Sequence, residues 1–174
     1  MRRVVMSRAL LLSIFAATSA LAQAVKTGDH VGTLRFADMK GEKVALDRPG
    51  VLYVVDLWAL GCKPCIQEIP ALDRLAAEYE PGGQVRVIGV LWGDWKKSDL
   101  KKVPKAVGSS RPIFGDPEGW FNRFEIRSFP TKLFIRDGVI VRITRGGPLN
   151  ATDAYDDLKA QIESELHPTP AKWE

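Results

Sequence analysis

The strongest constraint on the fold is a buried-strand pattern that leads directly into the only two cysteines of the chain. Residues 51–58 (VLYVVDLW) form a continuous apolar run rich in β-branched and aromatic side chains, which is typical of a strand covered on both faces. After Cys62 and Cys65, apolar residues recur at spacings of four and three as far as Tyr79. These features predict a central strand, a turn that carries the cysteines, and a helix that ends at Pro81.

Further elements on both sides of this unit extend the predicted sheet. A second continuous apolar run, residues 85–91, predicts a β-α-β unit with two parallel strands. Alternation at residues 34–36, a Lys-Gly turn and apolar residues at 44–46 predict an opening hairpin. The polar segment 92–110 is expected to carry one helix, at about residues 97–107.

The C-terminal third predicts a hairpin and a final helix. A short strand at 113–114 and a helical turn at 119–124 are expected first, and the strands 131–135 and 139–143 then flank an Asp-Gly turn, a strong hairpin signal. The last helix follows, and its apolar stripe consists of Tyr155, Leu158, Ile162 and Leu166. The predicted class is α/β, with a central mixed β-sheet flanked by helices, an N-terminal β-hairpin and a helical insertion after the first β-α-β unit.

Charge separates the N-terminus from the rest of the chain. The net charge is +4, but Arg2, Arg3 and Arg8 lie in a segment with no acidic residue before Asp29. Without these three arginines, 22 basic residues face 21 acidic ones. The basic residues are scattered except for Lys96-Lys97 and Lys101-Lys102, which we expect to form a solvated surface. This balance gives no support to nucleic-acid binding.

The first 22 residues have the three parts of a secretory signal peptide. A basic start, the apolar run 9–18 and the small residues of Ser19-Ala20-Leu21-Ala22 predict cleavage before Gln23. An uncleaved membrane anchor is the alternative, but an apolar run of about 14 residues is short of the ~17–25 that a spanning helix needs. No cysteine lies near the cut, which excludes a lipoprotein. We therefore expect export to an oxidising compartment, the periplasm, where a disulfide can persist.

The remaining chain predicts a single unit, because it has no repeats and no Gly/Ser-rich linker. We expect a signal peptide at 1–22, an N-terminal linker at 23–28, one domain at 29–166 and a flexible tail at 167–174.

Three roles are open to the cysteine pair. As a structural staple it would close a very short loop, which stabilises a fold less than a long-range bridge does. A zinc site would need two more ligands, and the chain offers only His30 and His167, which lie near opposite ends of its mature part. A redox couple fits best, because Cys62 would lie where a helix N-terminus favours a thiolate. The sequence therefore gives little support to a metal site, and no cofactor beyond the disulfide itself is expected.

Position suggests a role for each residue of the motif. Cys62, the first cysteine, is expected to attack, and Cys65, on the buried face of the helix, is expected to resolve the mixed disulfide. Lys63 adds a positive charge, and Pro64 fixes the backbone in the first helical turn, where a missing N–H is tolerated. A carboxylate at Asp56, inside an otherwise apolar strand, should have a raised pKa if it is buried. Its alternative is an outward-facing position.

Two stretches of the chain, DLWALGCKPCIQEIP at residues 56–70 and PIFGDPEGWFNRFEIRSFPTKLFI at residues 112–135, resemble the exported thioredoxin-like reductases of the TlpA, ResA and CcmG type. The resemblance spans roughly residues 29–166 and implies a thioredoxin-like fold. It also implies that Asp56 lies behind the cysteines and helps to deprotonate the buried one, and that Glu68 shapes the site.

The resemblance further identifies a substrate-docking loop at Phe129-Pro130-Thr131. It implies that the bond before Pro130 is cis, that Pro130 faces the cysteines, and that the backbone of Phe129 pairs with an extended substrate segment. Only about 5–6% of X-Pro bonds in folded proteins are cis, so this expectation depends on the resemblance.

Two residues depart from the family pattern. Gly61 stands where most relatives have Trp, and Phe129 is bulkier than the small residue common before the cis-proline. Both substitutions are expected to affect partner recognition. A further aromatic set is expected either to pack internally or to form a partner surface, and it consists of Trp92, Trp95, Trp120 and Phe121.

The sequence thus predicts a thiol:disulfide oxidoreductase that reduces disulfides in partner proteins. An oxidant or isomerase would use the same residues and differ only in reduction potential. A Cu(I)-binding metallochaperone, with the cysteines as soft ligands, is the alternative from another class. The partners implied by the family are thiol or disulfide proteins, among them apocytochrome c in cytochrome c maturation or a copper-site protein, and a membrane thiol-electron donor. We expect a monomer.

Overall fold

The computed structural model describes residues 24–38, 40–41, 43–93, 95–147 and 150–168. The elements in this part of the chain are β1 (Arg35–Ala37), β2 (Lys43–Ala45), β3 (Leu52–Trp58), α1 (Lys63–Tyr79), the 3-10 helix η1 (Glu80–Gly82), β4 (Val85–Leu91), α2 (Lys97–Leu100), α3 (Val103–Val107), β5 (Ile113–Gly115), α4 (Trp120–Arg123), β6 (Thr131–Arg136), β7 (Val139–Arg145) and α5 (Ala151–Leu166). Within these ranges, seven strands form one sheet in the order β2-β1-β5-β4-β3-β6-β7.

The two continuous apolar runs form the centre of the sheet. Strands β3 and β4 pair in parallel, and β6 pairs with the other edge of β3 in antiparallel orientation. Every residue of β3 is buried, which explains why its sequence lacks the alternation of a half-exposed strand. The hairpins β1-β2 and β6-β7 lie where the sequence predicts them. The predicted α/β class with a mixed sheet is confirmed.

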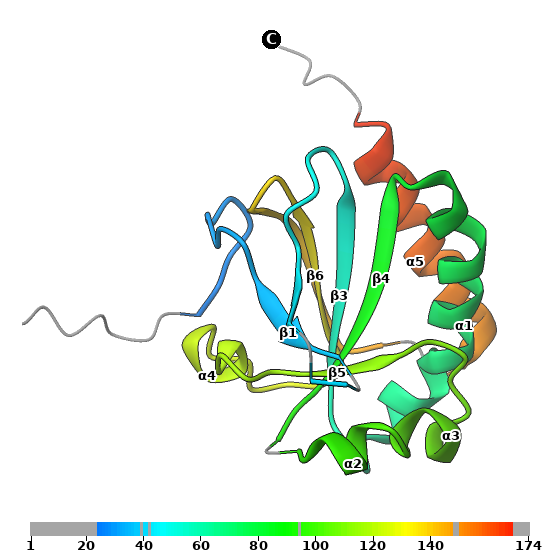
Figure 1. The fold of residues 1–174 in the computed structure, drawn as a ribbon. Helices are drawn as coiled ribbons and strands as arrows, with labels where there is room; N and C mark the ends of the chain where they lie inside the picture. The colour runs from blue at the N-terminus through cyan, green and yellow to red at the C-terminus, as the bar shows by residue number, and fades with distance from the viewer. Residues whose placement is uncertain (1–23, 39, 42, 94, 148–149, 169–174) are drawn as a thin grey trace, which may run out of the picture.

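Helices cover both faces of the sheet (Figure 1). Helices α1 and α5 lie together along one face, and α4 lies on the opposite side. The core beneath α1 and α5 includes Leu52, Val54, Leu72, Leu75, Phe134, Leu158 and Ile162. The core of the opposite face includes Phe36, Val55, Leu57, Ile88, Leu133 and the aromatic residues Trp120, Phe121 and Phe124. Successive residues of β3 therefore alternate between two separate apolar cores.

The predicted single helix at 97–107 is wrong, because α2 and α3 are two short helices. Pro104 lies in the first turn of α3 and has no N–H to donate to the carbonyl of Leu100, so a continuous helix would lose a hydrogen bond there. Both helices lie across the end of the sheet at which β3 and β4 finish (Figure 1). Leu100 and Val103 pack there against Trp58 and Leu91.

The described residues begin within the predicted linker, at residue 24, and end within the predicted tail, at residue 168. Residues 1–22, the predicted signal peptide, and residues 169–174 of the predicted tail lie outside the described residues. Residues 24–28, part of the predicted linker, contact the domain, because Val25 is buried and the N–H of Gly28 donates to the Ile140 carbonyl at 2.8 Å. Among the described helices, none has the length and apolar character of a membrane span.

Candidate functional site

The two cysteines form a disulfide at the start of α1. Cys62 is the N-cap residue, and its Sγ accepts a hydrogen bond from the backbone N–H of Cys65 at 3.3 Å. Pro64 lies in the first turn, where its missing N–H has no intrahelical acceptor to lose. The exposed Lys63 completes a turn without acidic residues. The sulfur of Cys62 therefore lies where the free N–H groups of the helix favour negative charge.

The two cysteines differ in exposure. Cys62 is partly exposed, whereas Cys65 is only 1% exposed and packs with Trp58, Leu91 and Ile113. A partner thiol or disulfide can reach the first sulfur but not the second. This inequality is the one that an attacking and a resolving cysteine need.

The loop before β6 lies at the same end of the sheet as the disulfide. The Phe129-Pro130 peptide bond is cis, as predicted. Thr131, which pairs with Leu57 of β3, donates its hydroxyl hydrogen to the Ser128 carbonyl at 2.8 Å. The side chains of Phe129 and Cys62 both pack against the apolar cluster that contains Cys65. The docking loop therefore lies at the same end of the sheet as the cysteines, with Phe129 packed against their cluster. That Pro130 faces the cysteines, and that the loop docks a substrate, stay predictions.

Asp56 is buried in the middle of β3, so the outward-facing alternative is wrong. It pairs with Gly89 on β4 and with Lys132 on β6, and its side chain is on the α1 side of the sheet. Its Oδ1 has no hydrogen-bond partner among the described residues. Burial raises the pKa of this carboxyl, against the opposing effects of Lys132 and then of Arg111. A carboxylate whose pKa is raised is a stronger proton acceptor than an ordinary carboxylate.

Glu68 forms a buried ion pair that the sequence did not reveal. The Lys132 ammonium donates to both of its carboxylate oxygens, at 2.7 Å and 2.5 Å, and each of these two side chains is 1% exposed. The same ammonium donates to the Gly146 carbonyl at 3.3 Å. Burial raises the pKa of Glu68 to about 7, because the loss of water outweighs the attraction of Lys132.

Lys132 and Arg111 are the two site residues that sequence reasoning missed. The signal for Lys132 was the same as for Asp56, a single charge inside an apolar strand, but it was not used. Arg111 donates from Nε to Asp73 at 2.6 Å, and its Nη1 lies within about 4 Å of the position that a Cβ on Gly89 would take. Because Gly89 pairs with Asp56, Arg111 lies on the β4 side of the buried carboxyl, whereas Lys132 lies on its β6 side.

The space behind Glu68 and Lys132 is a cavity of about 360 Å³ between α1, the β6-β7 hairpin and α5. Its wall includes Gly147, and a Cβ at this position would lie 2.2 Å from Glu68 Oε1. The absence of a side chain at Gly147 thus makes room for the carboxylate. Asp157 also lines the cavity and contributes to the raised pKa of Glu68.

The predicted aromatic set divides into two parts. Trp120 and Phe121 are buried in the core, which confirms internal packing for them. Trp92 is 50% exposed, and its ring lies 5.8 Å from that of Phe129, measured between centroids. Trp95 is half-buried in the apolar cluster around the cysteines. Of these four described residues, Trp92 is the one with a substantial exposed aromatic surface beside the site.

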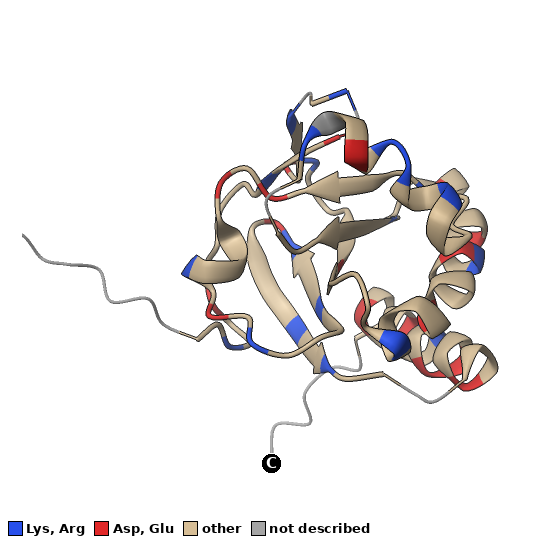
Figure 2. Ribbon diagram, turned by 90° about the horizontal axis from the view of Figure 1, so that it is seen from below, with Lys and Arg blue, Asp and Glu red and all other residues tan. Residues whose placement is uncertain are grey.

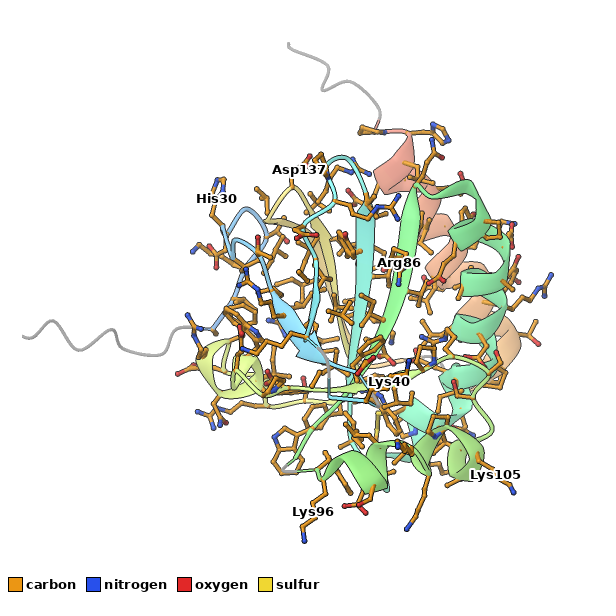
Figure 3. The ribbon with its side chains drawn as sticks, viewed as in Figure 1. His30, Lys40, Arg86, Lys96, Lys105 and Asp137 are labelled. Atoms are coloured by element: carbon orange, nitrogen blue, oxygen red, sulfur yellow. A yellow bond between two sulfur atoms is a disulfide. The ribbon has the colours of Figure 1, made fainter. Side chains whose placement is uncertain are left out.

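A third metal ligand does not lie near the cysteines in the described part of the chain. His30 lies beside the turn that carries Asp137, at the end of the molecule opposite Lys96 and Lys105 (Figure 3). His167 caps the end of α5 and lies 3.7 Å from the Glu163 carboxylate. In the described ranges, no three residues among His, Cys, Asp and Glu are grouped to hold a metal ion.

Comparisons with known proteins support the same chemistry. The chain is 28% identical over 174 residues to the thiol-disulfide oxidoreductase ResA of Geobacillus kaustophilus, with 94% of this chain and 96% of the relative covered. It is 27% identical over 137 residues to the thioredoxin-like protein YneN of Bacillus subtilis, covering 77% and 79% of the two chains. No family model matches the sequence.

A solved structure matches the fold. A thiol:disulfide interchange protein DsbE from Chlorobium tepidum superimposes with a TM-score of 0.68 at 26% identity, covering 83% of this chain and all of that one. The seven-stranded sheet with flanking helices is thus a thioredoxin-like fold, and it carries the cysteine pair at the start of its first long helix.

Proposed function

We propose that this chain, which is a thiol:disulfide oxidoreductase of the TlpA, ResA and CcmG type, works in the periplasm and reduces disulfides in partner proteins. The observation that carries the proposal is the unequal exposure of its cysteines. Cys62 is accessible at the N-terminus of a 17-residue helix, and Cys65 is 1% exposed behind it.

The reaction needs two thiol–disulfide exchanges. In the reduced protein, the Cys62 thiolate attacks one sulfur of a partner disulfide, and the other partner sulfur leaves as a thiolate that takes up a proton. Cys65, after losing its proton, then attacks Cys62 Sγ and releases the first partner sulfur as a second thiolate. Two electrons pass to the partner, and the Cys62–Cys65 disulfide is the oxidised product.

The residues around the disulfide suit these steps. The helix N-terminus and Lys63 favour the Cys62 thiolate, and Asp56 is the buried carboxyl that can take the proton of Cys65. In this proposal the disulfide is the only redox group, so no bound cofactor takes part. A thiol-electron donor in the membrane would return the dithiol form.

Export is supported by the N-terminal sequence alone. Its basic start, apolar run and small-residue cut before Gln23 have the pattern of a cleaved signal peptide. The physiological partner is proposed to be an oxidised protein of the periplasm, and apocytochrome c or a copper-site protein would have the required cysteines. Cell fractionation and N-terminal sequencing of the mature protein test location and cleavage together.

The decisive experiment is insulin reduction together with the reduction potential of the pair. The wild-type protein should reduce insulin with dithiothreitol as electron source. In Cys62→Ser the rate of insulin reduction should fall to background. A reduction potential of about −270 mV would support a reductant. A potential of about −120 mV would indicate a disulfide oxidant instead and would overturn the proposed direction. Full activity in Cys62→Ser would overturn the assignment of the attacking cysteine.

A further inference from the structure

The surface around Cys62 combines exposed apolar side chains with exposed lysines. Of the described residues, the large hydrophobic side chains that are exposed are Leu60 at 43%, Ile66 at 37% and Trp92 at 50%. Leu60 precedes the motif, Ile66 follows it, and Trp92 packs against Phe129 of the docking loop. We call these three side chains the apolar collar. Exposed apolar residues that gather in one place indicate a binding surface, whereas scattered ones do not.

Lysines surround this collar on the side of α2 and α3. Both helices pack on the cluster that contains Cys65, through Leu100 and Val103, so their outer surfaces flank the disulfide. Figure 2 looks onto this end of the molecule and shows basic positions along both helices. Lys96 and Lys105 extend from the body of the molecule at this end (Figure 3). We define the lysine rim as the exposed side chains of Lys63, Lys96, Lys101, Lys102 and Lys105.

The lysine rim has no ion pair in the part of the chain that the structure describes. In this its five members differ from many cations elsewhere in the described ranges, among them Lys43, which pairs with Glu118, and Lys159, which pairs with Glu78. The carboxylate of α2, Asp99, is half-buried. Beyond its first 22 positions the chain is nearly neutral, with 22 basic and 21 acidic residues. The positive charge at this end of the molecule therefore results from where the lysines are placed, not from the overall composition. A field of this kind attracts and orients an anionic partner.

From this arrangement we infer the chemistry of the partner segment that Cys62 attacks. Apolar residues flank the partner's cysteine, and carboxylates lie farther along the segment, where they reach the lysines around α2 and α3. The collar contacts the apolar residues, and the lysine rim pairs with the carboxylates. The inference rests on the proposed function, because it concerns the partner of the same sulfur. It adds a substrate class, acidic segments, that neither the motif nor the fold specifies.

The test compares two disulfide-bonded peptides of identical apolar core, one flanked by glutamates and one by lysines. At low salt the wild-type protein should reduce the acidic peptide with a kcat/KM about tenfold higher, and 0.5 M salt should remove most of the difference. The variant Lys96→Glu/Lys105→Glu should reverse the preference. Arg35→Glu/Arg48→Glu, an equal charge change on exposed residues away from α2 and α3, should keep it.

Hydroxyethyl disulfide, which is small and neutral, distinguishes the two failures. If wild type reduces neither this compound nor the peptides, the proposed function fails. If it reduces the compound but treats both peptides alike, the inference fails and the function stands. A third outcome would also overturn it: the lysine rim binding phosphatidylglycerol vesicles, lost in Lys96→Glu/Lys105→Glu, without any preference between the peptides.

Discussion

The two sulfur atoms of the disulfide face opposite environments, and charge is handled differently on each side. Around Cys62, lysines are exposed and have no ion pair with any described residue, so water screens them and a partner can reach them. On the inner side, beneath α1, the charged groups Asp56, Glu68 and Lys132 are all buried. Water cannot screen these groups, so each depends on its protein neighbours.

This difference separates two kinds of consequence. Changing a charge on the outer side should alter partner choice and salt dependence, with little effect on the free energy of unfolding. Changing a charge on the inner side should alter stability and pH dependence, because it leaves a neighbour buried without its partner. Four predictions test this separation, in order of decreasing effect.

The largest effect is expected from Cys65→Ser. The outer cysteine of this variant can still attack a partner disulfide, but no inner thiol remains to release the product. Multiple-turnover insulin reduction should therefore fall to background, while a mixed disulfide between Cys62 and the partner accumulates. Mass spectrometry of a non-reduced mixture measures this species. Turnover at the wild-type rate would show that the two sides do not divide the reaction.

The second prediction concerns the buried ion pair. Lys132→Met leaves the Glu68 carboxyl buried without its cation and should lower the free energy of unfolding at pH 8 by about 3–5 kcal/mol. Urea unfolding measures the loss. The double variant Lys132→Met/Glu68→Gln removes both charges and should recover most of the stability. An equal loss in the single and double variants would indicate packing, not charge, as the contribution of Lys132.

The outer and inner sides also differ in how far they could be predicted from the sequence. The cysteine turn, β3 and β4 follow from local patterns, and the β4 bounds match because an unbroken apolar run is bordered by polar and turn residues. The cis bond before Pro130 required the family resemblance. These features depend on neighbours in the chain or on a motif.

The inner network depends instead on residues distant in the chain. Glu68 and Lys132 are 64 positions apart and meet only because β6 pairs with β3 beneath α1. Arg111, in the segment before β5, lies on the β4 side of Asp56, opposite Lys132. Local patterns do not contain such tertiary pairing, so an isolated charge in an apolar strand could indicate a buried group but not its partner. The prediction of one helix at 97–107 failed at a local signal, Pro104, that was present.

The third prediction is a pH dependence. Burial raises the pKa of Asp56, and that of Glu68 to about 7, so both carboxyls ionise at lower pH in the unfolded chain than in the folded one. Their contribution to stability is complete below about pH 4 and is lost as the pH rises through the folded-state values. The wild-type protein should therefore be more stable at pH 5 than at pH 8.

Asp56→Asn isolates one of these groups. The variant should be more stable than the wild type at pH 8, by on the order of 1 kcal/mol, and should show no such gain at pH 3, where Asp56 is protonated in both states. Its rate of Cys65 attack should lose the rise with pH that a proton acceptor gives. Stopped-flow measurement of mixed-disulfide decay follows this step. An unchanged pH profile would mean that Asp56 does not take the proton.

The smallest effect is expected on the outer side, at Gly61. Its φ of +79° is in the left-handed region that favours glycine, and a Cβ there would meet nothing within 4 Å. Backbone strain, not a clash, therefore limits substitution, and Gly61→Ala should cost about 1 kcal/mol in urea unfolding. This conformation gives a physical reason for glycine at position 61, where the resemblance implies Trp.

Gly61→Trp separates the backbone from the ring. It should have a similar cost in stability to Gly61→Ala, because the strain is the same, but its ring can cover Cys62. Peptide reduction should then slow more than reduction of hydroxyethyl disulfide, which needs less space. If reduction of both substrates slows equally, the substitution changes the reactivity of Cys62 itself, and Gly61 does not determine which partners bind. A loss of stability much larger than that of Gly61→Ala would show that the outer side is more tightly packed than the open space around Gly61 indicates.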